Sequence, residues 1–389
     1  MDCPQNEHLG TVEFLEQFNR KVAQQRVPLT GSIELTHRCN LDCVHCYLGA
    51  RGSRASEHQE LTTAQWLSVL DQATEAGCLY LLITGGEPTL RRDFAAVYRH
   101  AKQLGLLVTV FTNGTLISDE VIDLFADLPP RQVEISLYGA TAETYETITG
   151  VRGSFERCMA GIRRLLDAHL HVGLKTVLMT LNRHEFLAIE EMAKDMGVGF
   201  RFDAAIFPCL DGDMTPVQLR VAAREAVATE MADVKRLETW RDFYRRQREI
   251  APAETLYQCG AGTSAFHVDP YGSLTPCLML DEPSCNLARS TFRAGWQTVM
   301  PRLHERKASA GFACSTCEKR ALCGYCPAFF AIENGAEDVR SEYLCAIGHL
   351  RYETVAGETV PAQREGDRGE DRSQAADETA LREAQAPSH

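Results

Sequence analysis

Long apolar runs are missing from this sequence, and so is an excess of positive charge. No run approaches the roughly 20 apolar residues that a membrane-spanning helix needs. Residues 1–10 contain neither the basic nor the apolar segment of a secretory signal peptide. The formal net charge of −13 disfavours a nucleic-acid partner. We therefore predict a cytoplasmic protein that binds neither membranes nor nucleic acids.

Cysteine, by contrast, is abundant. The chain has 15 cysteines among 389 residues, and most of them occur in two groups. In a small secreted protein such a count would indicate disulfides, but in a long chain without an export signal clustered cysteines indicate metal binding. With 44% hydrophobic residues, the chain is long enough for a large core and about two domains.

Strand-like segments alternate with helix-like segments over residues 31–205. The predicted strands are Ser32–Thr36, Leu79–Thr84, Leu106–Phe111, Gln132–Leu137, Val172–Leu178 and Val198–Ala204. The predicted helices are Thr62–Ala76, Asp93–Leu104, Ser118–Ala126, Ser154–Ala168 and Glu185–Met196. This order is typical of a parallel sheet or a partial barrel. In such barrels the active site lies at the C-terminal ends of the strands.

The rest of the chain differs in composition. Residues 217–250 are charged and free of glycine and proline, which predicts one or two helices that bridge domains. Residues 259–350 are rich in cysteine, glycine and proline, so we expect a small domain held by metal rather than by a core. The polar end of the chain predicts disorder. The expected division is 1–30, 31–205, 206–258, 259–350 and 351–389, as N-terminal segment, barrel, helical bridge, small domain and tail.

Three cysteines follow the first predicted strand at a C-x3-C-x2-C spacing: Cys39, Cys43 and Cys46. Three thiolates can hold three irons of a cubic [4Fe–4S] cluster and leave the fourth iron open for chemistry. The common zinc pattern differs, because a second ligand pair accompanies its C-x2-C pair. Gly85-Gly86-Glu87-Pro88 follows the second predicted strand, and by itself it would indicate only a turn.

Together, the cysteine triad and the Gly-Gly-Glu-Pro segment resemble the radical S-adenosylmethionine (SAM) superfamily over roughly residues 31–205. The resemblance implies an α/β fold with a partial (βα)6 barrel. It also implies that the open iron binds the amino and carboxylate groups of SAM. Transfer of one electron, from a reductant such as flavodoxin or ferredoxin, would release a 5′-deoxyadenosyl radical that abstracts a substrate hydrogen. The cofactor does this chemistry, and the protein positions it.

The same resemblance assigns contacts with SAM. Gly85, Gly86, Glu87 and Pro88 would meet the methionine amino group, with Glu87 as the hydrogen-bond acceptor. Asn113 lies in a polar segment after the third strand, and Ser136 lies on the strand that would contact the ribose. Lys175, on the fifth strand, would meet the carboxylate of SAM, although alone it reads as a solvated lysine.

Two further positions bear on SAM. Related enzymes often place an arginine after the ribose strand, but residues 145–149 here read Tyr-Glu-Thr-Ile-Thr, so that contact has no counterpart. His45, before the third cysteine, is expected to be a neighbour of the adenine rather than a metal ligand.

A second cysteine set lies downstream, namely Cys259, Cys277, Cys314, Cys317, Cys323, Cys326 and Cys345. With the Gly272-x4-Cys277 spacing, it resembles the SPASM domain of peptide-modifying radical SAM enzymes, although its central block ends with x2 where x3 is common. The resemblance implies two auxiliary [4Fe–4S] clusters, and thus three clusters in all. The first would use Cys259, Cys277 and Cys326. The second would use Cys314, Cys317, Cys323 and Cys345.

The first auxiliary cluster would be one ligand short, and substrate, solvent or Cys285 could complete it. Structural zinc is the alternative for this region, since C-x2-C pairs are its signature. The gap between the pairs is only five residues, however, and zinc ribbons have about 15–20.

Other residues near the predicted site are ambiguous. Cys209 follows the sixth strand and could donate a hydrogen atom to a substrate radical, or it could be a small buried hydrophobe. Arg201 and Asp203 alternate with aromatics, so both should point into the barrel, as ligand contacts or as a structural ion pair. The isolated Cys3, Cys78 and Cys158 are expected to be structural. His169, His171, His184 and His267 show no ligand spacing.

Three functions follow from these patterns. The leading hypothesis is an enzyme that cross-links, epimerises or oxidises a ribosomally made peptide or protein. About 30 residues precede the first strand, too few for a separate leader-binding domain, which leaves a separate recognition partner or a substrate without a leader. The second hypothesis is a sugar or alcohol epimerase or dehydrogenase with Cys209 as hydrogen donor. The third, a non-catalytic iron–sulfur or zinc protein, explains the cysteines but not the Gly-Gly-Glu-Pro segment.

Overall fold

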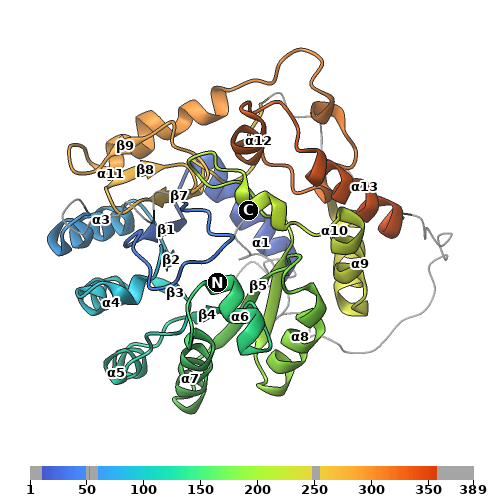
Figure 1. The fold of residues 1–389 in the computed structure, drawn as a ribbon. Helices are drawn as coiled ribbons and strands as arrows, with labels where there is room; N and C mark the ends of the chain where they lie inside the picture. Colours follow the sequence, from blue (N-terminus) through green and yellow to red (C-terminus); the bar gives the residue numbers. More distant parts are fainter. Residues whose placement is uncertain (1–10, 50–51, 53–59, 248–254, 357–389) are drawn as a thin grey trace, which may run out of the picture.

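A computed structural model of the chain describes residues 11–49, 52, 60–247 and 255–356. Its centre is an open nine-stranded sheet in the order β6-β5-β4-β3-β2-β1-β7-β8-β9 (Figure 1). The six parallel strands of the barrel are β1 Thr30–Glu34, β2 Tyr80–Thr84, β3 Leu107–Thr112, β4 Gln132–Ser136, β5 Val172–Val177 and β6 Gly199–Asp203. The predicted α/β partial (βα)6 barrel is confirmed.

Helices cover the outside of these strands (Figure 1). They are α3 Thr63–Glu75, α4 Phe94–Gln103, α5 Asp119–Asp127, α7 Ser154–Asp167 and α8 Phe186–Asp195, each close to its predicted range. Local signals set their starts: Thr62 and Gln65 form a capping box on α3, and the Ser118 side chain accepts from the backbone of Val121 at the start of α5. Apolar side chains of these helices and of the strands pack into one core.

The remaining strands extend the barrel sheet rather than forming a separate one. β7 Ala265–Val268 pairs in parallel with β1, and β8 Ser273–Thr275 and β9 Cys285–Asn286 follow antiparallel. Phe266, Phe292 and Trp296 belong to the same hydrophobic core as the barrel. A hydrophobic core therefore holds this part of the cysteine-rich region, contrary to our expectation of a metal-held domain. The limits 31–205 and 259–350 stay predictions.

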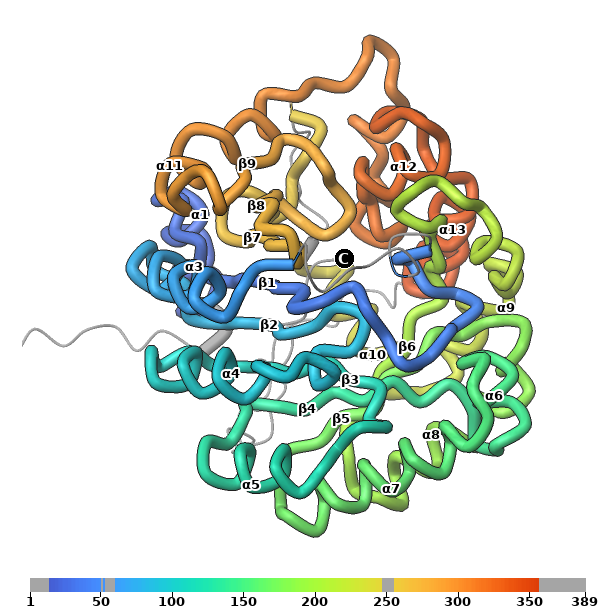
Figure 2. The backbone as a smooth tube through the Cα atoms, turned by 60° about the vertical axis from the view of Figure 1, so that its left-hand side comes forward, coloured from blue at the N-terminus to red at the C-terminus, as the bar shows by residue number. Residues whose placement is uncertain are grey.

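The end of the described chain reaches the opposite edge of the sheet (Figure 2). The bridge forms α9 Ala223–Met231 and α10 Val234–Gln247, and the last helix, α13 Glu342–Ala356, packs against both. The Tyr343 hydroxyl donates to the carbonyl of Ala204, just after β6 (3.2 Å). Arg220 pairs with Glu333 of α12 Pro327–Asn334 (2.7 Å). The cysteine-rich region thus contacts both edges of the open barrel.

Several predicted boundaries need correction. β1 begins and ends two residues earlier than predicted. The last two residues of the predicted strand, Leu35 and Thr36, belong instead to the segment that leads to Cys39. α1 Thr11–Gln25, α6 Ala142–Thr149, α12 and α13 were not predicted. The first residues of the predicted tail are helical, since α13 continues to Ala356, and the rest of the tail lies outside the described residues, as does Cys3.

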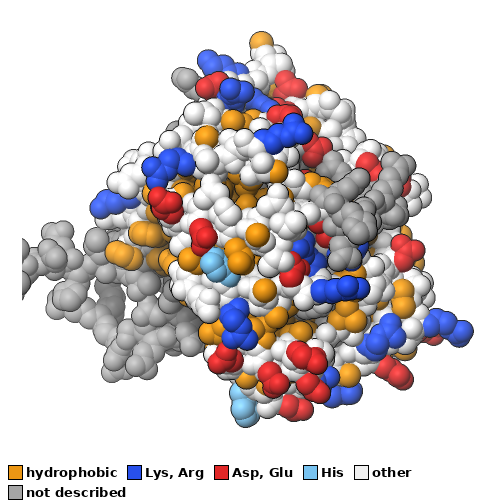
Figure 3. Space-filling view, turned by 90° about the vertical axis from the view of Figure 1, so that its left-hand side faces the viewer, with side chains coloured by type: hydrophobic (Ala, Val, Ile, Leu, Met, Phe, Trp, Pro, Cys, Tyr) orange, Lys and Arg blue, Asp and Glu red, His pale blue; other side chains and the backbone are white. Residues whose placement is uncertain are grey.

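Charged side chains of both signs lie on the surface. On the face shown in Figure 3, acidic and basic side chains are interspersed, with apolar side chains between them. Among the described residues, no helix is both long and apolar enough to cross a membrane.

Candidate active site

One cavity of about 910 Å³ opens at the C-terminal ends of the barrel strands. Most of the residues predicted to act on SAM line it: Cys39, Cys43, Cys46, Gly85, Gly86, Asn113, Ser136 and Lys175. Arg201, Asp203 and Cys209 line it as well, as their places after and along β6 led us to expect. Glu87 and Pro88 do not reach the cavity wall.

Backbone hydrogen bonds hold the cysteine loop in place. The amides of Asp42 and Val44 donate to the carbonyls of Thr149 (2.9 Å) and Ile148 (3.0 Å), at the end of α6. α6 ends at Gly150, whose left-handed backbone (φ 70°) suits glycine. Ile148 and Thr149 belong to the segment that lacks the arginine of related enzymes. They support the cysteine loop through their backbone carbonyl groups instead.

The three thiols of this loop lie close together. Burial raises the pKa of Cys39 to about 11, and the neighbouring Glu87 and Cys46 act in the same direction. Burial also raises the pKa of Cys43, followed by the effects of Cys46 and Cys39. Each thiol must therefore release a proton when it binds iron. Three adjacent thiols facing one cavity fit three irons of a [4Fe–4S] cluster.

Gly85 and Gly86 allow two backbone segments to pack closely together. The amides of Gly86 and Glu87 donate to the carbonyls of Thr36 (2.7 Å) and Arg38 (2.9 Å). A Cβ atom on Gly86 would lie 2.7 Å from the His37 carbonyl oxygen and closer still to that of Arg38. Only glycine lets this segment run beside the entrance of the cysteine loop.

Glu87 lies behind the cavity wall and is fully buried. Its carboxylate accepts hydrogen bonds from Thr112 Oγ1 (2.9 Å), the Asn113 amide (2.8 Å) and the Thr89 amide (3.1 Å). Burial raises the pKa of Glu87, although these hydrogen bonds oppose the shift. In this conformation Glu87 positions Asn113, whose side-chain amide donates to Asn40 (2.9 Å) in the cysteine loop.

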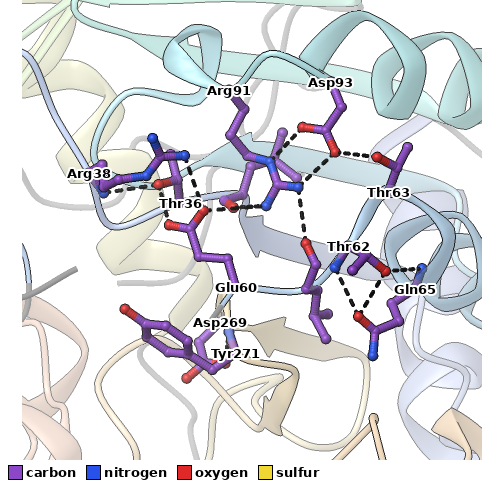
Figure 4. Close-up of polar contacts among 12 residues, drawn as sticks. Thr36, Arg38, Glu60, Thr62, Thr63, Gln65, Arg91, Asp93, Asp269 and Tyr271 are labelled. Carbon is purple, nitrogen blue, oxygen red and sulfur yellow. Dashed lines mark hydrogen bonds and ion pairs between the residues drawn. The ribbon is translucent and has the colours of Figure 1, made fainter. Parts of the chain in front are cut away.

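A second buried network lies beneath the entrance of the loop (Figure 4). Glu60 accepts a hydrogen bond from Thr36 and pairs with Arg38 (3.3 Å) and Arg91 (3.6 Å). Arg91 also donates to the carbonyl of Leu35 (2.8 Å). These contacts join the segment before Cys39 to the turn after the Gly-Gly-Glu-Pro segment.

Lys175 and Ser136 are neighbours at the ends of β4 and β5. The Lys175 Nζ atom lies 3.2 Å from the centre of the Phe111 ring, so the side chain is not solvated. Burial lowers the pKa of Lys175 to about 7, and Arg201 acts in the same direction. Arg201 itself is paired with Glu134 (2.5 Å). Lys175 is thus the cation in this corner that is best placed to meet an anionic ligand.

Two more side chains flank the cysteine loop. The His45 ring packs edge-on against Tyr138 (4.5 Å), and burial lowers the pKa of His45 to about 4, so the ring is neutral at pH 7. The Cys209 thiol donates to the carbonyl of Cys46 (3.3 Å). Burial raises the pKa of Cys209 to about 11, with Asp211 and Asp213 acting in the same direction. The thiol therefore keeps its hydrogen at neutral pH.

A polar cluster at the floor of the cavity was missed. His267 lies on β7 beside Ser32 and Glu34 of β1, and the Ser32 Oγ atom is 2.8 Å from its Nδ1. The isolated histidine carries no local signal, because its partners lie some 235 residues away in the chain.

The downstream cysteines fall into two groups. Burial raises the pKa of Cys277, and Cys326 and Cys259 add to the shift, so these three lie together. Burial raises the pKa of Cys323 to about 12, and Cys314, Cys317 and Cys345 add to it. Cys285 instead packs against the barrel core. Cys78 and Cys158 are buried and isolated, as expected.

Among the described residues, no group of three His, Cys, Asp or Glu side chains could hold a single metal ion. Zinc requires four ligands around one point, whereas thiolates of a [4Fe–4S] cluster bind different irons and lie farther apart. The assignment of the two downstream groups to iron–sulfur clusters stays a prediction.

Comparisons with known proteins identify the family of this chain. A model of the radical SAM superfamily matches residues 33–196. The mycofactocin maturase MftC of Mycobacterium tuberculosis is 30% identical over 68% of this chain and 67% of its own length. A PqqA peptide cyclase of Bradyrhizobium diazoefficiens is 25% identical over 85% of this chain and 88% of its own. An AdoMet-dependent heme synthase of Methanosarcina barkeri is 28% identical over 79% and 93%.

The fold also occurs in solved structures. Streptococcus suis SuiB bound to its precursor peptide SuiA superposes with a TM-score of 0.66 at 18% identity, over 89% of this chain and 83% of SuiB. The cysteine-rich C-terminal region is consistent with the SPASM type. This chain belongs to the radical SAM superfamily and is an enzyme.

Proposed function

We propose that this enzyme cleaves SAM at the Cys39–Cys43–Cys46 loop and abstracts a hydrogen atom from a ribosomally made peptide or protein. The cavity of about 910 Å³ carries the proposal, because it joins the three cysteines to a polar strand-end surface with room for a second molecule. SAM and the iron–sulfur cluster of the family are its cofactors.

The residues around the cavity would divide the work. When bound, a [4Fe–4S] cluster with an open iron supplies one electron to SAM, whose cleavage yields the 5′-deoxyadenosyl radical. Gly85 and Gly86, which line the cavity, would lie beside the methionine amino group, and Glu87 holds Asn113 against the loop. Ser136 offers its hydroxyl to the ribose, and Lys175 offers its ammonium group to the carboxylate.

The downstream cysteines would hold two auxiliary [4Fe–4S] clusters, for three in total. Cys259, Cys277 and Cys326 would hold one, and Cys314, Cys317, Cys323 and Cys345 the other. A one-electron reductant such as flavodoxin or ferredoxin would supply electrons, in the cytoplasm and without a membrane or nucleic-acid partner.

A peptide is the preferred substrate because two relatives carry peptide or maturation chemistry in their names, a PqqA peptide cyclase and a mycofactocin maturase. The product would be cross-linked, epimerised or oxidised. A small-molecule reaction is the second candidate, since an AdoMet-dependent heme synthase matches 79% of this chain. In that case Cys209, which keeps its hydrogen, would be the donor of an epimerase.

Incubation of the reconstituted enzyme with SAM, reductant and short peptides encoded beside its gene tests the proposal. We expect one peptide to raise the yield of 5′-deoxyadenosine and either to lose a whole number of hydrogens, as in a cross-link or an oxidation, or to keep its mass with one inverted carbon centre. Peptides with deuterium at carbon should pass it to 5′-deoxyadenosine. Deuterium transfer only from a small molecule, with every peptide unchanged, would favour the second candidate.

A further inference from the structure

A line of three side chains joins the cavity to a buried carboxylate. Ser32 and Glu34 lie on β1, and His267 lies on β7 in register with Ser32. The Ser32 Oγ atom is 2.8 Å from Nδ1 of His267, and Nε2 of the same ring is 3.4 Å from Glu34 Oε2. Both Ser32 and His267 line the cavity.

Glu34 is ionised. It is 1% exposed and also accepts hydrogen bonds from the Tyr47 hydroxyl (2.7 Å) and from His37 Nε2 (3.0 Å). Burial alone would raise the pKa of Glu34, but the hydrogen bonds from His267 and His37 hold it well below its usual range.

The charge on Glu34 fixes the tautomer of His267. An ionised carboxylate can only accept, so Nε2 of His267 must carry a hydrogen. In the neutral ring Nδ1 then holds a lone pair, and the Ser32 hydroxyl donates to it. Ser32 Oγ keeps its own lone pairs for a group in the cavity. The other charged or titratable groups that face the ring are His37, after β1, and Asp269, after β7.

We propose that Ser32 and His267 form a proton-transfer site, which accepts the proton of a substrate O–H, S–H or N–H group as that group bonds to carbon. Ser32 would be the catalytic residue, because it lines the cavity in which the substrate would bind. His267 and Glu34 act through it as positioning residues. The inference rests on the proposed function, because only an oxidative reaction in this cavity leaves a proton to be accepted.

The step balances with the cofactors already proposed. Joining a substrate carbon to a heteroatom breaks a C–H bond and an X–H bond and forms a C–X bond. The carbon loses a hydrogen atom to the 5′-deoxyadenosyl group. An auxiliary [4Fe–4S] cluster held by the downstream cysteines would be the acceptor of the remaining electron. The X–H proton passes to Ser32, whose own proton moves to Nδ1 of His267.

Nitrogen NMR of the reconstituted full chain, labelled at histidine, tests this arrangement without a substrate. The His267 signals are those lost in His267→Gln. We expect a hydrogen on Nε2 and none on Nδ1 at neutral pH, with Nδ1 accepting a hydrogen bond from Ser32. A ring with its hydrogen on Nδ1 would donate to Ser32 and could not take up the hydroxyl proton.

Variants separate the contributions. Ser32→Ala should move the Nδ1 resonance, and Ser32→Thr, which keeps a hydroxyl, should restore it. Glu34→Gln should allow the hydrogen to move to Nδ1, because an amide can donate as well as accept and no longer requires a hydrogen on Nε2. Asp71→Asn is the matched control: Asp71 pairs with His100 (2.7 Å), so only the His100 signals should change.

A hydrogen on Nδ1 at neutral pH overturns the inference. Should Glu34→Gln fail to fold, the wild-type spectrum and the two Ser32 variants still decide. Absence of 5′-deoxyadenosine would overturn the proposed function instead, and the NMR result does not depend on it.

Discussion

Lys175 shows how a single residue can couple ligand binding to a proton. Its ammonium group lies against Phe111, and burial lowers the pKa of Lys175 to about 7. Above pH 7 the side chain of the free protein is therefore mostly neutral. Arrival of the SAM carboxylate would favour the charged form, so that binding takes up a proton.

Calorimetry of SAM binding in two buffers of different ionisation enthalpy measures this uptake. We expect uptake of most of a proton at about pH 8 and little at about pH 6. Lys175→Met should weaken binding about tenfold and abolish the uptake, because a charge-assisted hydrogen bond is lost. Lys194→Met, at an exposed lysine paired with Glu191, is the control. Equal affinity and uptake in Lys175→Met would remove Lys175 from the SAM site.

Cys209 decides between two reaction outcomes. Because burial raises the pKa of Cys209 to about 11, the thiol retains a hydrogen that exchanges with solvent. If the reaction is an epimerisation, product formed in deuterium oxide should carry deuterium at the inverted carbon, and Cys209→Ala should lose most of the activity. Cys78→Ala, at another buried cysteine, should keep it. Full epimerisation by Cys209→Ala would rule out this donor.

At the scale of elements, the site depends on the way in which strand ends meet loops. The segment 36–38 leaves β1 and runs beside Gly85 and Gly86, which leave β2. The Glu60–Arg91 network and the end of α6 hold the same loop from other sides. Rigid elements thus preorganise the three cysteines before any cofactor binds.

Gly86→Ala should break this arrangement. Its Cβ atom would enter the space of the His37 and Arg38 carbonyl groups, so the free energy of unfolding should fall by about 2 kcal/mol or more. Iron bound by the loop should fall with it. Gly199→Ala in β6, where nothing lies within 4 Å, is the control. Denaturant unfolding and iron analysis check both variants, and unchanged values for Gly86→Ala would refute the close-approach argument.

Elements with a local signal could be predicted from the sequence, and those without one could not. The buried run Leu79–Thr84 predicted β2 within one residue, because parallel strands covered on both faces read as apolar runs. α6 was missed because it is short and rich in threonine. In the site, the spacing of Cys39, Cys43 and Cys46 was sufficient to predict that the three cysteines would lie together at the cavity. The pairing of His267 with Glu34 was not predictable, because it depends on β7 joining β1.

At the scale of the molecule, the cysteine-rich region contributes His267 and Leu278 to the wall of the cavity. β7 extends one edge of the sheet, and α12 and α13 lie toward the other edge (Figure 2). There Tyr343 donates to the carbonyl of Ala204, and Glu333 pairs with Arg220. The same region carries both downstream cysteine groups. An enzyme built in this way can place auxiliary clusters around the substrate space.

Iron analysis tests the three-cluster proposal on the whole chain. The reconstituted enzyme should hold about twelve irons, as three cubic clusters of four. Replacing either the group Cys259, Cys277 and Cys326 or the group Cys314, Cys317, Cys323 and Cys345 with alanine should leave about eight. About four irons together with stoichiometric zinc in the wild type would instead establish zinc in the C-terminal region.

The most direct test of the account is SAM cleavage itself. Anaerobically reconstituted enzyme is mixed with SAM and a strong reductant, and 5′-deoxyadenosine is quantified. The control is the Cys39→Ala, Cys43→Ala, Cys46→Ala variant, whose other cysteines are intact. We predict 5′-deoxyadenosine from the wild type and none from the variant. No product from wild-type protein with intact clusters, or equal amounts from both proteins, would contradict the assignment of the radical chemistry to this loop.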